Sequence, residues 1–124
     1  MSDFNKLPKA EFELMKVIWA GGSGHSAPTL ANNLRESKNW TQQTVLTLLN
    51  RLERRGFLRS VKTGKERVFS PLVSEEEYVW FESKLFLKVF HQGSMAGMIR
   101  ALYAGKELNQ KDFDELKQFL DERG

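Results

Sequence analysis

The chain has 124 residues, of which 40% are hydrophobic and 28% are charged. These proportions are typical of a globular protein and exclude a disordered or fibrous chain. The absence of cysteine excludes a disulfide framework and any metal site built from thiolates. The formal net charge of +3 is unevenly spread: residues 1–73 carry 12 Lys and Arg against 6 Asp and Glu, whereas residues 74–124 carry 7 against 10. The N-terminal part is therefore the part that suits an anionic partner.

A first amphipathic helix is predicted over residues 8–20. Its apolar side chains, Leu14 and Ile18 among them, are interrupted by Lys16 and preceded by Glu11. A signal sequence or a membrane span needs a longer uncharged apolar run than this segment offers. We therefore expect a cytoplasmic protein.

A second helix is predicted over residues 27–37, after the glycine-rich segment of residues 21–24. Ser26 is available as its N-cap, and Pro28 falls in the first turn, where its missing N–H costs little. The two helices are therefore expected to be separate elements.

The third predicted helix, residues 42–55, has one apolar side. Val45, Leu48, Leu49 and Leu52 recur at the three- and four-residue spacing of one buried helical face. Thr41 can cap its start, and Gly56 can take the left-handed conformation that ends a helix.

The side chains outside that face are mostly amides, hydroxyls and guanidinium groups, which can contact base edges in a major groove and the flanking phosphates. We therefore interpret this element as a recognition helix. Its candidate DNA-contacting residues are Thr41, Gln42, Gln43, Thr44, Leu46, Thr47, Asn50, Arg51 and Arg54.

Two β-compatible runs follow, residues 57–62 and 66–70, separated by a turn that contains Gly64. Lys62, Lys65 and Arg67 lie at or beside the tip of this hairpin and are added to the candidate DNA contacts. Three helices followed by a hairpin predict a winged helix-turn-helix, in which the third helix enters the major groove. The predicted fold class is mainly α, with an N-terminal winged-helix DNA-binding domain over residues 1–73.

Residues 74–124 are predicted to form a helical dimerisation domain. Ser74 and Glu77 have the spacing of a capping box, and the helix that follows is apolar around most of its circumference. A short helix over residues 95–103 and a helix capped by Asn109 offer too little chain to cover it. A second copy of the same element would cover this surface. The expected interface residues are Tyr78, Phe81, Leu85, Phe86, Val89, Phe90, Met98, Leu102, Phe113, Leu116 and Leu120.

Three segments of the sequence resemble the BlaI/MecI family of penicillinase and methicillin-resistance repressors. They are residues 10–19 (AEFELMKVIW), 40–52 (WTQQTVLTLLNRL) and 70–78 (SPLVSEEEY). The resemblance covers nearly the whole chain. It implies a homodimeric winged-helix repressor on a palindromic operator of double-stranded DNA. It also implies release by a membrane-bound sensor protease pathway that responds to antibiotic and leads to cleavage in the C-terminal domain.

The chain departs from that family pattern at three places. Leu46 stands where the recognition helix of the family commonly has Lys or Arg. The C-terminal cysteines of the copper-responsive branch are absent. The bond that corresponds to the family's Asn–Phe cleavage site falls near Ala101 and Leu102, which are the candidate cleavage residues.

Functions other than DNA binding have less support in the sequence. We do not expect an enzyme, because the sequence shows no nucleophile with a base, no phosphate-binding glycine loop and no metal-ligand cluster. His25 and His91 are lone histidines, so no metal and no cofactor is expected.

A winged-helix module for protein contacts alone stays open, as does a repressor that binds a small ligand among its C-terminal aromatic residues. That aromatic group favours a core or a dimer interface over a ligand site. The basic group of residues 51–62 would alone be typical of a solvated surface. Beside a polar-faced helix it favours DNA.

Overall fold

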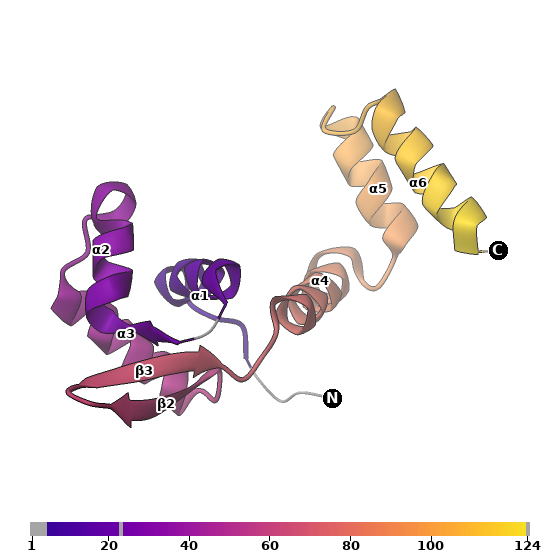
Figure 1. Cartoon of the computed structure of the whole chain (residues 1–124). Helices are drawn as coiled ribbons and strands as arrows, with labels where there is room; N and C mark the ends of the chain where they lie inside the picture. Colours follow the sequence, from indigo (N-terminus) through magenta and orange to yellow (C-terminus); the bar gives the residue numbers. More distant parts are fainter. Residues whose placement is uncertain (1–4, 23, 124) are drawn as a thin grey trace. The chain divides into compact units, whose positions relative to one another are not determined.

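The computed structural model describes residues 5–22 and 24–123, and it divides into two compact units between Trp80 and Phe81 (Figure 1). Ser23, which belongs to the glycine-rich segment, lies outside the described residues. The division comes seven residues after the domain boundary expected from sequence, residue 73. The reason is Tyr78, whose side chain belongs to the core of the N-terminal unit.

The N-terminal unit contains three helices, of which α3 is the predicted recognition helix, and a β-hairpin (Figure 1). The elements are α1 (Lys9–Gly21), α2 (Ala27–Lys38), α3 (Gln42–Arg54), β2 (Leu58–Thr63) and β3 (Glu66–Pro71). Apolar side chains of all three helices and of the hairpin are buried together. The predicted winged helix is confirmed.

A further strand, β1 (His25–Ser26), pairs antiparallel with β3 and gives a sheet of order β1-β3-β2. His25 lies opposite Phe69, and Ser26 lies opposite Val68. This strand was not predicted from the sequence. A strand of two residues is too short to show an alternating pattern, and its pairing partner lies more than forty residues away in the chain.

The caps expected around α2 and α3 are confirmed. The Ser26 hydroxyl accepts a hydrogen bond from the Thr29 N–H, at 3.4 Å, and the Thr41 hydroxyl accepts one from the Thr44 N–H, at 3.1 Å. Gly56 has φ +86° and follows Arg55, the C-cap residue of α3. Glycine takes the left-handed conformation without the steric penalty of a Cβ atom, so the chain leaves α3 at a fixed point.

Tyr78 is fully buried among aromatic rings of the N-terminal unit. Its ring centroid lies 5.6 Å from that of Phe12, 6.0 Å from that of Trp19 and 5.5 Å from that of Phe57. Its hydroxyl accepts a hydrogen bond of 2.6 Å from the backbone N–H of Leu7. Tyr78 lies in the first turn of α4 (Glu75–His91), and its contacts anchor this turn to α1 and to the segment after α3.

The prediction that Tyr78 lies in a dimer interface is therefore wrong. Its exposed fraction is 0% in the single chain, so it has no surface to offer a second copy. The sequence grouped Tyr78 with the apolar residues after it because all share one helix. The core that buries it comes from segments remote in sequence.

An ion pair joins α1 to the end of α3. The Arg55 Nε donates to Glu11 Oε1 at 2.5 Å, and its Nη2 donates to Glu11 Oε2 at 3.4 Å. The Glu11 side chain is only 2% exposed, so its charge depends on this guanidinium for compensation. A second pair, Lys38 with Glu13, joins α2 to α1, and this hydrogen bond lowers the pKa of Glu13.

The C-terminal helices are α4 (Glu75–His91), which begins in the N-terminal unit, α5 (Met95–Ala104) and α6 (Gln110–Arg123). The capping box predicted at Ser74 and Glu77 is present, as is the cap at Asn109. α5 and α6 contact each other through Tyr103 and Phe113, whose ring centroids are 5.9 Å apart. Among the described residues, each helix is too short or too polar to span a membrane.

Replacing Tyr78 by Ala should lower the free energy of unfolding of the N-terminal unit by about 3–5 kcal/mol, because a fully buried aromatic ring is removed. Tyr78→Phe keeps the ring but leaves the Leu7 N–H without its partner, and should cost about 1–3 kcal/mol. Urea denaturation of the intact chain measures both. Equal stability of the wild type and both variants would contradict the anchoring role of Tyr78.

Candidate nucleic-acid interface

α3 exposes one side to solvent because its other side is completely buried. Val45, Leu49 and Leu52 have an exposed fraction of 0%, and Leu48 has 6%. The predicted contact residues divide into two groups by exposure. Leu46 and Thr47 are half-buried, and the exposed ones are Thr41, Gln42, Gln43, Thr44, Asn50, Arg51 and Arg54. The structure therefore gathers the candidate residues of α3 on its accessible side.

The N-terminal end of α3 suits a phosphate. Its first turn has no acidic residue, so no side chain neutralises the positive end of the helix dipole. The hydroxyl oxygens of Thr41 and Thr44 lie 3.0 Å apart, within hydrogen-bond distance of each other. Thr41 thus has a structural role as the cap in addition to its exposed position.

Thr47 has a restricted set of contacts to offer. Its hydroxyl donates to the backbone oxygen of Gln43 at 3.0 Å, so the proton is already used within the helix. What remains for a partner is the oxygen as an acceptor and the methyl group. Leu46 beside it adds a purely apolar contact, which in a major groove matches the methyl group of thymine.

The hairpin places two cations directly opposite each other. Lys62 of β2 pairs with Arg67 of β3, in the register that also pairs Ser60 with Phe69. Side chains alternate between the two faces along each strand, so Lys62 and Arg67 lie on the same face of the hairpin as the fully buried Phe69. They lie nearer the tip of the hairpin, where this face is exposed. Like charges in direct opposition repel each other, so this arrangement favours a bound anion. Lys65 lies in the turn between the strands.

A hydrogen-bonded contact that was not predicted from the sequence connects the hairpin to α3. The Ser60 hydroxyl donates to Glu53 Oε2 at 2.7 Å, and Arg67 Nη1 donates to the Ser60 oxygen at 3.0 Å. No local pattern reveals this contact, because its three residues come from three different elements.

The basic group of residues 51–62 is not a single surface. Arg55 is held by Glu11, as described above, and so acts within the fold. Arg59 pairs with Ser70 across the hairpin, on the side opposite to Lys62 and Arg67. Arg51 and Arg54 remain as exposed cations on the accessible side of α3.

The C-terminal unit offers an apolar surface without a core of its own. None of residues 81–123 is buried, and several large apolar side chains are mostly exposed, including Phe90 at 66%, Val89 at 60% and Phe119 at 57%. Of the interface residues predicted in this unit, Phe81, Leu85, Met98 and Phe113 are half-buried. Those that are exposed are Phe86, Val89, Phe90, Leu102, Leu116 and Leu120.

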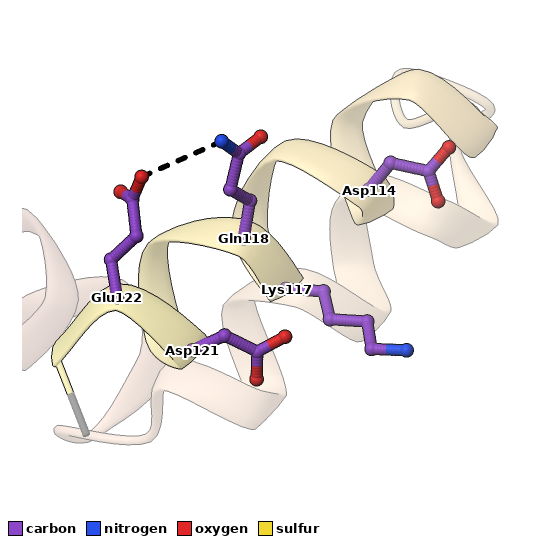
Figure 2. Close-up of a pocket in the computed structure, with 5 residues that line it drawn as sticks. All are labelled: Asp114, Lys117, Gln118, Asp121 and Glu122. Atoms are coloured by element: carbon purple, nitrogen blue, oxygen red, sulfur yellow. Dashed lines mark hydrogen bonds between the residues drawn. The ribbon is translucent and has the colours of Figure 1, made fainter.

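Figure 2 shows a hollow on the surface of α6 that bears on the ligand-binding alternative. The residues that line it all have polar or charged side chains and come from one side of the helix: Asp114, Lys117, Gln118, Asp121 and Glu122. Gln118 donates to Glu122 at 3.5 Å, and no aromatic ring lines the hollow. It does not resemble the apolar pocket that a small ligand bound among aromatic side chains needs. Nor do His, Asp and Glu side chains of the described residues gather into a group that would hold a metal ion.

The model of the penicillinase repressor family matches residues 7–122. The chain belongs to the penicillinase repressor family. The penicillinase repressor of Bacillus licheniformis is 30% identical over 122 residues, which covers 98% of this chain and 94% of that protein. The methicillin resistance regulatory protein MecI of Staphylococcus aureus (strain N315) is 26% identical over 118 residues, which covers 95% of each chain.

Two solution structures of the repressor BlaI are similar to a part of this chain. One is its DNA-binding domain, with a TM-score of 0.54, and the other is the monomeric form from Bacillus licheniformis in complex with the blaP half-operator, with a TM-score of 0.53. Each is 32% identical and covers 63% of this chain and 94% of the solved chain. The resemblance seen in the sequence is confirmed. The penicillinase repressor family is a family of transcriptional repressors, which confirms that the chain is no enzyme.

In this chain, Thr47→Ala or Arg51→Ala should weaken binding to a specific operator by about 1–3 kcal/mol for each interaction with a base that the substitution removes. Binding to random DNA should fall less, because interactions with phosphates supply most of it. Fluorescence anisotropy with both duplexes measures the difference, and Arg123→Ala on α6 is the control for the removal of one cation. Equal weakening on both duplexes would show that these residues do not read bases.

Proposed function

We propose that the chain is a sequence-specific DNA-binding repressor that occupies a palindromic operator as a homodimer. In this proposal α3 lies in the major groove of each half-site, and the hairpin contacts the phosphate backbone. The observation that carries the proposal is the polar accessible side of α3, set beside the opposed cations Lys62 and Arg67. The BlaI structure with a half-operator, at 32% identity, supports the same use of the unit here.

The predicted contacts have different roles in this proposal. The amide side chains of Gln42, Gln43 and Asn50 can pair with adenine, and Arg51 with guanine. Lys62, Lys65 and Arg67 meet phosphates and set affinity on all sequences. Leu46 supplies an apolar contact where the family commonly has a cation, so the preferred operator of this chain is expected to differ from that of such relatives.

Dimerisation is supported by the absence of buried residues between positions 81 and 123. An isolated unit of this size without a core cannot offset the entropy of ordering its helices. A second copy would cover the exposed apolar side chains of α4, α5 and α6. Each partner then buries the same surface, as a two-fold axis requires, and that axis matches the symmetry of a palindrome.

The dimer proposal predicts that Phe90→Asp makes the chain monomeric, because a charge cannot be buried in an apolar interface. Binding to a full palindrome should then weaken by about a hundredfold or more, because the gain in effective concentration disappears. Lys88→Ala is the matched control, because it makes the same change in net charge on the opposite side of α4 and should leave the dimer intact. Sedimentation equilibrium measures the assembly, and a dimeric Phe90→Asp variant would contradict this placement of the interface.

We also propose that a sensor protease pathway ends repression by a cut between Met98 and Tyr103. Ala101 and Leu102 lie within α5, so this helix must open before a protease can bind the chain in extended form. In the single chain α5 buries none of its residues, so opening it costs little wherever a second copy does not cover it. The cut would separate α6 from the rest of the dimerisation surface and so lower the affinity for the operator.

Mass spectrometry of the protein from cells exposed to a β-lactam tests this route. Fragments that end between residues 98 and 103 should accumulate as repression ends. Full-length protein that persists during derepression would contradict proteolysis and favour a ligand-sensing repressor. The module for protein contacts alone would be favoured if no salt-sensitive binding to any duplex were found.

A further inference from the structure

Ser60 lies between the hairpin and α3 and has a hydrogen-bond partner on each side. It belongs to β2, its hydroxyl donates to Glu53 of α3 at 2.7 Å, and it accepts from Arg67 of β3 at 3.0 Å. The chemistry of the partners fixes the direction of both bonds. A guanidinium group only donates and a carboxylate only accepts, so the single proton of Ser60 must go to Glu53.

The position of Arg67 needs such a restraint. Lys62 stands directly opposite it in the hairpin, and the two charges repel each other. A long side chain under repulsion at an exposed position would occupy many rotamers. The bond to Ser60 uses one N–H of the guanidinium group, and its other N–H groups remain to contact a phosphate.

We propose that Ser60 is a positioning residue for DNA binding, which holds Arg67 at a fixed distance from α3. The proposal rests on the proposed function, because it assumes that α3 reads bases and that Arg67 meets a phosphate. Glu53 is the fixed point of the arrangement, since it belongs to the same helix as the base-reading side chains. The position of the hairpin's phosphate contact is thus fixed relative to the base contacts of α3.

The bond from Arg67 to Ser60 raises the affinity for DNA by preorganising the arginine side chain. Ordering a side chain as long as arginine on binding lowers affinity, and a side chain that is already held avoids most of that penalty. Removing the Ser60 hydroxyl should therefore weaken operator binding by about three- to tenfold. This weakening should depend on Arg67 being present, which separates a positioning role from a general effect on the hairpin.

The test uses the intact chain and a duplex enriched by the wild-type protein from a random-sequence pool. The variants are Ser60→Ala, Ser60→Thr, Arg67→Ala and the double variant Ser60→Ala/Arg67→Ala. Ser70→Ala is the matched control, because Ser70 lies on the same hairpin but on its other side, opposite Arg59. Kd is measured between 50 and 200 mM salt, about the range over which interactions with phosphates show their salt dependence.

Ser60→Ala should bind about three- to tenfold more weakly, Ser60→Thr and Ser70→Ala should bind as the wild type does, and Ser60→Ala should have no further effect once Arg67 is absent. Arg67→Ala should lower the salt slope by about 0.9. If Ser60→Ala fails to fold, Ser60→Cys replaces it in the single and the double variant. Cysteine keeps the size of the side chain without a strong hydrogen bond.

Two results would overturn the proposal: wild-type affinity in the variant without the hydroxyl, or the same weakening with and without Arg67. Both leave the proposed function intact, because the wild type still binds the selected duplex. A wild-type protein that enriches no duplex from the pool would overturn the proposed function itself and this inference with it.

Discussion

Burial of one side of α3 is the constraint on which the rest of the structure depends. Val45, Leu48, Leu49 and Leu52 leave the helix no freedom to rotate about its axis without exposing apolar surface, so the polar side must face solvent. The ion pair between Glu11 and Arg55 then holds the C-terminal end of this helix against α1. The surface that we propose contacts DNA therefore follows from the packing of the core.

The features that the sequence predicted are local. The periodicity of α3, its cap at Thr41, the left-handed Gly56 and the capping box at Ser74 each depend on residues a few positions apart, and each is found. The features it missed depend on contacts between distant segments. β1 needs its partner β3, and Tyr78 needs a core built by α1 and by the segment after α3. For the same reason, the bonds of Ser60 have no signature in the sequence.

The two units are stabilised in different ways. The N-terminal unit has a core that includes Tyr78, so its fold does not depend on a second chain. The C-terminal unit buries none of residues 81–123, and in our account it is stabilised by association. Occupancy of the operator is then linked to protein concentration and to the integrity of α5 and α6. A signal that acts on these helices can therefore control a DNA-binding surface that it never touches.

The central claim is that the accessible side of α3, together with the hairpin, forms the surface that contacts DNA. It is tested most directly by an NMR titration of the intact, ¹⁵N-labelled protein with the duplex that it selects from a random pool. The account predicts that amide shifts change most over residues 41–54 and 62–67, while those of α6 stay nearly constant. Shifts that change mainly in α5 and α6, with α3 unaffected, would contradict it.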